Sequence, residues 1–230
     1  MVCCRRHVRH HPPHFPGATA ADVAAWYQRS AAQGYARAQH SLGSCYESGD
    51  GVPCDAAAAF RLYRLSANQG FADAQRDLGR CYYHGIGTAV DAAAAVRPLY
   101  VAAAEGDAGA QYDLGVCYAS GHGVAVDHAA AARCFMLASG QGHVGAHHRL
   151  GVAFYNGNGV PSKAATAVAL WRQAAAYDHA DAQYNLGTCY NDGTGVDRDV
   201  ATAVSWLRNA AAQGDVEAIA ALAHLEASRS

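Results

Sequence analysis

The chain repeats itself every 36 residues, and this period constrains its fold more than any other feature of the sequence. An alanine, a leucine and a glycine return in the same register along most of the 230 residues. They are Ala38, Ala74, Ala110, Ala146, Ala182 and Ala218; Leu42, Leu78, Leu114, Leu150, Leu186 and Leu222; and Gly43, Gly79, Gly115, Gly151 and Gly187. Such a period indicates a repeat protein, in which each copy buries its apolar face against its neighbours.

Each copy predicts two helices joined by a tight turn. In the first copy Ala38, Leu42 and Tyr46 lie on one helical stripe. Gly49 suits the left-handed position that ends a helix, and Asp55 suits the N-cap of the next helix. The glycine that follows the recurrent leucine costs helix stability. We therefore expect another helix to pack too closely there for a side chain.

We predict an all-α fold, because alanine-rich runs favour helix and strand-like alternation is rare. The first helix of each copy is called first-type here and the second helix second-type. The register predicts a lone second-type helix at 20–33, five helix pairs over 37–212 and a lone first-type helix at 217–228. Residues 1–19 form a flexible, basic and histidine-rich tail in this interpretation.

Charge and hydropathy narrow the function classes. The formal net charge is −2, and the first 21 residues hold three arginines and no acid, so the remainder is more acidic than the whole. A nucleic-acid partner is not expected, because a protein surface that binds nucleic acid needs a cluster of basic residues. The sequence has no apolar run near the roughly 20 residues of a membrane span, and no secretory signal. We expect a cytoplasmic, reducing location, where eight cysteines do not imply disulfides.

The segment "AQYDLGVCYASGHGVAVDHAAAARCFMLASGQGH", which starts at Ala110, resembles the Sel-1-like repeat, a relative of the tetratricopeptide repeat. The resemblance covers about nine-tenths of the chain. It implies a right-handed α/α superhelical solenoid of 36-residue helix-turn-helix repeats. Members of the family serve as adaptors or scaffolds without an active site. The resemblance therefore implies a non-catalytic protein with a protein or peptide partner. We expect a monomer and no cofactor.

Three residues depart from the repeat pattern. Lys163 replaces the capping aspartate, and Ser162, one residue earlier, could cap in its place. Asp178 stands where the other copies have glycine and must adopt the left-handed conformation. Pro98 falls in the middle of a second-type helix, where we expect a bend or a shortened helix.

Four of the cysteines share one repeat position: Cys45, Cys81, Cys117 and Cys189. Stacked helices pack about 8–10 Å apart, farther than the roughly 7 Å limit between the Cα atoms of a disulfide. We interpret these four, and Cys134, as small core side chains, and Cys54 as an exposed loop thiol. A cysteine-rich branch of the family binds penicillin-like molecules, but it has paired cysteines where this chain has alanines such as Ala38 and Ala67. A β-lactam-binding or hydrolysing enzyme is thus the alternative function.

No metal site is predicted. Thirteen histidines are scattered, and the adjacent His147 and His148 point in different directions on a helix. The Gly-x-Gly turns lack the third glycine of a dinucleotide fingerprint, and the acids of 192–199 are explained by capping and exposure. No nucleophile lies at a supporting distance from a base.

The hypothesis for a binding surface comes from the related tetratricopeptide arrays, whose ligands lie along the concave face of the first-type helices. The matching central column is His40, Arg76, Tyr112, His148 and Tyr184, and the flanking candidates are Glu47, Arg80, Tyr83, Tyr155 and Asn191. Aromatic residues and arginine are enriched at interface hot spots. We expect this groove to bind a peptide or protein segment.

The tail leaves alternatives open. Cys3 and Cys4, followed by two arginines, are similar to doubly palmitoylated segments beside a basic patch, and such a tail would tether the scaffold to a membrane. The same cysteines and the four tail histidines could instead gather zinc, although their spacing matches no standard finger. An unmodified, disordered tail is the simplest interpretation.

Overall fold

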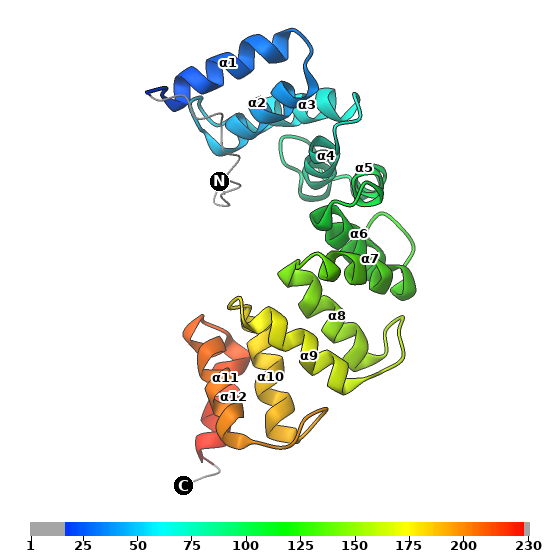
Figure 1. The fold of residues 1–230 in the computed structure, drawn as a ribbon, viewed down its shortest axis with the longest axis vertical. Coiled ribbons are helices and arrows are strands. Elements are labelled where there is room, and N and C mark those ends of the chain that lie inside the picture. The colour runs from blue at the N-terminus through cyan, green and yellow to red at the C-terminus, as the bar shows by residue number, and fades with distance from the viewer. Residues whose placement is uncertain (1–16, 228–230) are drawn as a thin grey trace. The chain divides into compact units, whose positions relative to one another are not determined.

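The computed structural model describes residues 17–227, and every regular element in that range is an α-helix (Figure 1). Twelve helices follow one another in the described chain. They are α1 (Ala20–Ala32), α2 (Ala36–Ser48), α3 (Ala56–Ala67), α4 (Ala72–His84), α5 (Ala92–Ala104), α6 (Ala108–Ser120), α7 (His128–Gly140), α8 (Val144–Asn156), α9 (Ala164–Ala175), α10 (Ala180–Asp192), α11 (Val200–Ala212) and α12 (Val216–Ala227). The prediction of an all-α repeat fold is confirmed.

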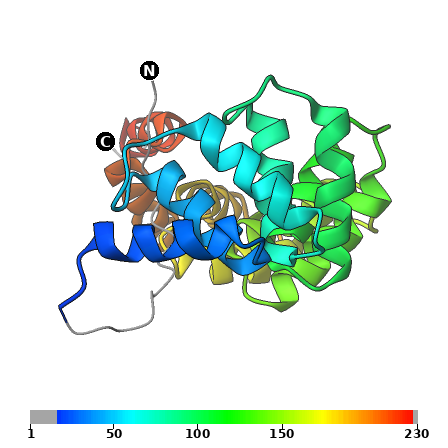
Figure 2. The same cartoon turned by 90° about the horizontal axis from the view of Figure 1, so that it is seen from above.

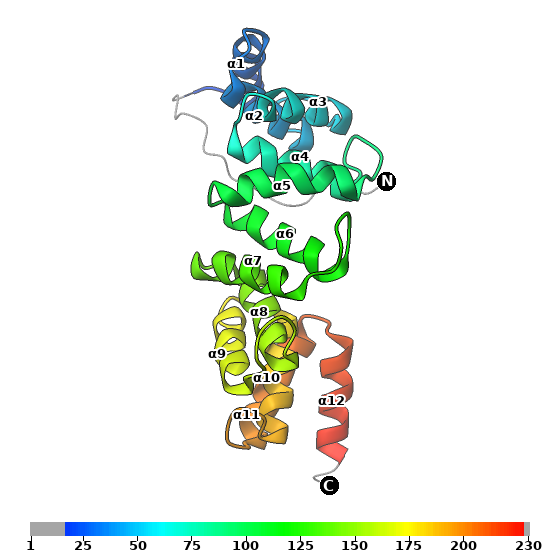
Figure 3. The ribbon, with the colours of Figure 1, turned by 90° about the vertical axis from the view of Figure 1, so that its right-hand side faces the viewer.

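The chain divides into two compact units within α6. Unit 1 runs to Ala110 and includes 122–124, and unit 2 holds 111–121 and everything from Ala125 onward. In unit 1, α2 packs on α3 and α4 on α5, while α1 covers α2 (Figure 2). In unit 2, α8 packs on α9 and α10 on α11, while α12 packs against α11 (Figure 3). Each helix therefore contacts mainly its neighbours in the sequence, as a repeat protein requires.

Side-chain caps start most of the second-type helices. Asp55 accepts a hydrogen bond from the backbone N–H of Ala58 at 2.9 Å, as predicted. The equivalent residues that cap in the same way are Asp91, Asp127 and Asp199. The expectation that Ser162 caps α9 is wrong. Its hydroxyl donates to the Tyr155 carbonyl at 3.0 Å, and the N-cap residue Lys163 makes no side-chain cap bond.

The glycine that follows the recurrent leucine lies against a large side chain of the next helix. A Cβ atom on Gly43 would come within 2.8 Å of Cε1 of Tyr63. The same contact joins Gly79 to Leu99, Gly115 to Phe135, Gly151 to Trp171 and Gly187 to Leu207. The expected close packing is confirmed, and it explains why these helices tolerate a residue of low helix propensity.

The second glycine of each Gly-x-Gly turn contacts the preceding copy. Gly51 has φ 72°, and a Cβ on it would collide with the carbonyl group of Ala20 at the start of α1. The equivalent contacts join Gly87 to Ala56, Gly123 to Ala92, Gly159 to His128 and Gly195 to Ala164. These turns thus lock one copy to the copy before it.

Two departures from the pattern have clear outcomes. Asp178 adopts φ 58°, the left-handed conformation expected for it. Pro98 does not shorten its helix: α5 has 13 residues, as many as α4. Pro98 and Leu99 are both buried, and Leu99 packs on Gly79 of α4. This packing keeps the helix intact despite the missing N–H donor.

Candidate functional site

In unit 1, three of the predicted partner-binding residues meet at one buried carboxylate, that of Asp77 on α4. The Nε2 atom of His40 lies 2.9 Å from Oδ2 of Asp77. Arg80 donates to Oδ1 at 2.8 Å, and Arg76 donates to the same oxygen at 3.4 Å. Because an ionised carboxylate only accepts, His40 carries its proton on Nε2. We call this set the Asp77 network.

The network extends to two further acids. Arg80 also pairs with Glu47 at 3.2 Å, and the hydroxyl of Tyr63 donates to the other Glu47 oxygen at 2.6 Å. Arg76 pairs with Asp107 at 3.0 Å. Both arginines therefore have two acidic partners each, which fixes the direction of their guanidinium groups.

The electrostatics favour the ionised form of Asp77. Burial by itself favours the neutral acid, but the hydrogen bond from His40 and the charges of Arg76 and Arg80 outweigh it and lower the pKa of Asp77. Burial, together with the charges of Asp77 and Glu47, raises the pKa of Tyr63. The tyrosine therefore stays a neutral donor.

The surface position expected for His40 is wrong. Its side chain is 2% exposed and lies between the rings of Tyr63 and Phe71, at centroid distances of 5.5 and 5.2 Å. The imidazole is used to join α2 to α4 and is not presented to a partner. Arg80 keeps 32% of its side chain exposed, and Glu47 keeps 27%.

In unit 2, His148 occupies the repeat position of His40 and is also buried, at 8% exposure. Its Nε2 atom lies 3.2 Å from the side-chain amide nitrogen of Asn185, and its ring lies 4.7 Å from the ring of His179. The expected surface position is wrong here as well, because the ring fills the space between α8 and α10.

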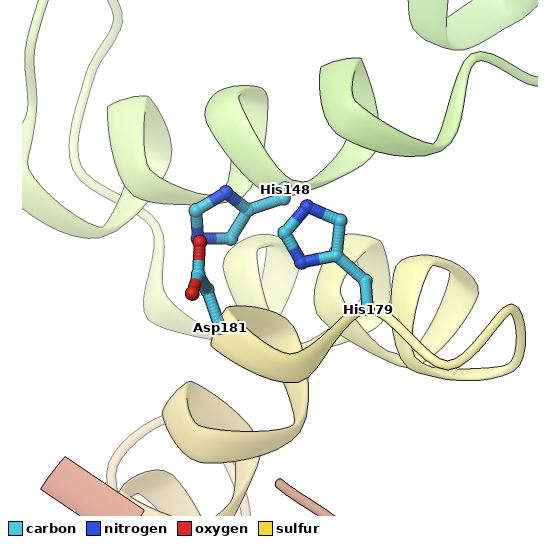
Figure 4. Close-up of side chains that lie close together, drawn as sticks. All are labelled: His148, His179 and Asp181. Atoms are coloured by element: carbon cyan, nitrogen blue, oxygen red, sulfur yellow. The ribbon is translucent and has the colours of Figure 1, made fainter. Parts of the chain in front are cut away.

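His148, His179 and Asp181 form a compact group (Figure 4). One potential ligand atom from each lies within 4.8 Å of the other two. Burial, with the neighbouring charge of His179 as a second cause, lowers the pKa of His148 to about 4. The imidazole of His148 is therefore neutral at pH 7 and keeps a lone pair.

His179 is placed differently from the histidine one copy earlier. His143 starts α8, and its Nδ1 atom accepts a hydrogen bond from the N–H of Ala146 at 3.2 Å. His179 starts α10 but makes no such cap. Its Nδ1 atom is buried and has no hydrogen-bond partner within the described part of the chain.

Three of the predicted tyrosines, on α6, α10 and α4, pack against other side chains. Tyr112 stacks on His143 with ring centroids 4.6 Å apart. Tyr184 packs on the core that contains Leu207. Tyr83, from α4, lies 5.3 Å from the ring of His122. These side chains are only partly available to a partner.

Tyr155 and Asn191 stand at equivalent positions near the ends of α8 and α10. Tyr155 is 42% exposed and lies beside Trp171. The amide of Asn191 donates to Asp192 at 2.8 Å, while its buried Oδ1 atom has no hydrogen-bond partner in the described residues. Binding of a partner by the predicted residues stays a prediction.

Sequence reasoning did not find the residues that hold the central column. Asp77 and Asn185 follow their histidines by 37 residues, and Phe71 and His179 follow them by 31. Each interval is close to one repeat length, so a search for complementary residues one copy away would have found these pairs.

The six described cysteines are free: Cys45, Cys54, Cys81, Cys117, Cys134 and Cys189. Cys54 is exposed, as expected, and three of the four cysteines at the shared position are buried. Burial raises the pKa of Cys81 to about 12, so this thiol is unreactive. The proposed lipidation or zinc residues of the tail, including Cys3 and Cys4, lie outside the described residues.

The model of the Sel1 repeat matches 24–35, 36–71, 72–107, 108–143, 144–178 and 180–215. The chain belongs to the Sel1 repeat family. Proteins of this family are generally non-catalytic scaffolds. The matched ranges divide the chain at the same places as the 36-residue period, and the resemblance seen in the sequence is confirmed.

Solved structures show the same fold. The protective antigen c5321 of uropathogenic Escherichia coli, which has an SLR fold, is 30% identical over 90% of this chain, with a TM-score of 0.81. The chain spans only 44% of that antigen. A Sel1 repeat protein from Oxalobacter formigenes is 29% identical over 86% of this chain and 81% of its own length, with a TM-score of 0.77.

A more distant structure shares the fold alone. Immunity protein Pa5087 from Pseudomonas aeruginosa is 18% identical over 90% of this chain and 79% of its own, with a TM-score of 0.51. No curated protein sequence matches the chain. Within 17–227, no helix has the length and apolar character needed to cross a membrane.

Proposed function

We propose that this Sel1 repeat protein is a non-catalytic scaffold that binds a peptide or protein segment on its first-type helices. The observation that carries the proposal is the state of Arg80. Its guanidinium is fixed by Asp77 and Glu47, yet a third of the side chain stays accessible. An arginine held in place before binding loses little conformational entropy on contact with a partner, which favours affinity. Arginine is also among the residues that dominate interface energetics.

In unit 2 the side chain proposed to contact the partner is Tyr155. Its ring is 42% exposed and is supported from behind by Trp171, with centroids 5.5 Å apart. A tyrosine supported in this way offers an apolar face and a hydroxyl to a partner. We propose that Arg80 and Tyr155 contact the partner, whereas His40 and His148 act inside the fold.

The test compares partner recovery by proximity labelling and quantitative pull-down with matched variants. Arg80→Ala and Tyr155→Ala are each expected to weaken partner capture by about tenfold or more. The controls are Arg61→Ala and Tyr100→Ala, which remove exposed residues of the same types from second-type helices. Far-UV circular dichroism checks the fold of each variant. Equal capture by all four variants and the wild type would refute binding through Arg80 and Tyr155.

We propose that the protein works in the cytoplasm. The free state of the six described cysteines, three of them buried, supports a reducing compartment. Cell fractionation of the wild type and of a Cys3→Ser, Cys4→Ser variant tests this location. A membrane fraction that disappears in the variant would instead support the acylated tail.

A further inference from the structure

We propose that His148, His179 and Asp181 of unit 2 bind a divalent transition-metal ion, and that zinc is the ion that best fits this set. Two imidazole nitrogens and one carboxylate oxygen are typical zinc ligands. Magnesium and calcium prefer oxygen ligands alone and are disfavoured here. The proposal goes beyond the scaffold function and does not depend on it.

The distances suit a small ion after a modest adjustment. In a tetrahedral zinc site the bonds are about 2.0–2.1 Å, which places the ligand atoms roughly 3.4 Å apart. The three atoms here already lie within 4.8 Å of one another. His148 is buried and fixed, whereas Asp181 is exposed in the first turn of α10 and its carboxylate can rotate (Figure 4). Rotation of the Asp181 carboxylate can therefore shorten its distances to the two imidazoles.

The two histidines lie close enough to share one ion. His148 is buried, and its ring centroid lies 4.7 Å from that of His179. His179 leaves Nδ1 buried and without a hydrogen-bond partner in the described chain, instead of capping α10 as His143 caps α8. A buried nitrogen without a partner costs free energy, and coordination would remove that cost.

Unit 1 supplies an internal comparison. The residues equivalent to His148, His179 and Asp181 are His40, Phe71 and Asp73. Phenylalanine has no ligand atom, and His40 is already hydrogen-bonded to Asp77. The positions on α2 and α4 therefore lack the ligand set that lies between α8 and α10. Three protein ligands also leave one position of the ion for water or for a donor atom from a partner.

Asn185 holds the ring of His148 before an ion arrives. Its amide nitrogen lies 3.2 Å from Nε2, and an ion at that atom would displace the amide. This contact is weaker than the carboxylate contact that His40 makes at 2.9 Å. The imidazole of His148 is therefore the more available of the two.

The test is thermal unfolding of the full chain with added Zn²⁺, and with Mg²⁺ as a second ion. An ion that binds only the folded site raises the Tm, and the rise grows with the ratio of the free ion concentration to its Kd. The wild type is expected to show a rise with Zn²⁺, reversed by a chelator, and none with Mg²⁺. His179→Phe, which copies unit 1, and Asp181→Asn are expected to weaken zinc binding at least tenfold. Asp73→Asn, the same change in unit 1, should respond like the wild type.

Calorimetric titration separates this site from the tail, whose cysteines and histidines are present in every variant. His179→Phe and Asp181→Asn should each bind one equivalent of zinc fewer than the wild type. The proposal fails if the wild type shows no rise in Tm, or if both variants keep its full rise and stoichiometry. Asp181 is exposed, so Asp181→Asn should fold like the wild type. If His179→Phe does not fold, the result for Asp181→Asn alone tests the proposal.

Discussion

His40 in unit 1 and His148 in unit 2 stand at the same repeat position, and they have opposite surroundings. Both are buried between two first-type helices. His40 meets the carboxylate of Asp77, whereas His148 meets the amide of Asn185. The repeat thus fixes where a histidine lies, and the residue 37 positions later decides what the histidine can do.

Because of this difference, His40 makes a structural contact, whereas His148 is a potential binding group. In unit 1 the shared carboxylate is held by His40, Arg76 and Arg80, so its charge is balanced within the fold. In unit 2 no carboxylate takes the place of Asp77, and burial keeps His148 neutral. A neutral imidazole beside a second histidine has a lone pair to offer.

Removal of the carboxylate from unit 1 should have the largest effect. Asp77→Ala leaves His40 buried without its partner and two arginines without a shared acid. We expect a loss of about 3 kcal/mol in the free energy of unfolding, since the arginines are partly exposed. Urea denaturation measures it, and hydrogen exchange should locate it in α2 and α4. Asp50→Ala, in an exposed loop, is the control, and a similar loss in both variants would contradict the role of Asp77.

Acid should weaken unit 2 before unit 1. The pKa of His148 falls from its ordinary 6.5 to about 4 in the folded chain, so the unfolded chain binds the proton more readily. The stabilisation is complete above pH 6.5 and is lost as the pH falls through 4. The free energy of unfolding should fall by about 3 kcal/mol over this range. Because the pKa of Asp77 is lowered, this carboxylate stays ionised in the folded chain at pH values below its ordinary pKa of 3.8. The stabilisation of unit 1 by Asp77 is therefore lost only at lower pH.

Hydrogen exchange at pH 7 and pH 4.5, with a chelator present, measures this difference. The amides of α8 and α10 should lose protection at pH 4.5 while those of α2 and α4 keep it. A His148→Gln variant should lack the additional pH dependence of unit 2. Equal losses in both units would contradict the assignment to His148.

A single exchange in unit 2 should reproduce part of the environment of unit 1. Asn185→Asp places a carboxylate beside His148 and is expected to raise the pKa of that histidine by roughly 1–2 units. Titration of the imidazole signals by NMR, again with a chelator, measures the shift. Asn68→Asp adds the same charge at an exposed position in unit 1 and should leave His148 unchanged. No shift in Asn185→Asp would show that the two residues do not interact.

The sequence was sufficient for the helices, because each boundary depends on local chemistry repeated five times. Asp55 and Gly49 mark the same cap and turn in successive copies, and the contact of Gly43 follows from its recurrence. The shortened helix allowed for at Pro98 is wrong, because the packing of α5 outweighs a local penalty.

The candidate sites were predicted less well, since they depend on pairs of residues in different copies. The column of His40 and His148 was expected to face outward, by resemblance to related arrays. Its burial follows from Phe71, Asp77 and their equivalents, which reach across from the next copy. A period shows what the copies share, whereas these contacts depend on residues that differ between copies.

The contact between Gly51 and Ala20 has a consequence for how this protein can change in length. The Gly-x-Gly turn of one copy contacts the first residue of the second-type helix in the previous copy. An extra residue in that turn, or in the turn that leads into that helix, would break this contact. Loss or gain of a whole 36-residue copy keeps every such contact. Variation in this chain is therefore expected to come in complete copies, while single insertions are confined to the ends of the array.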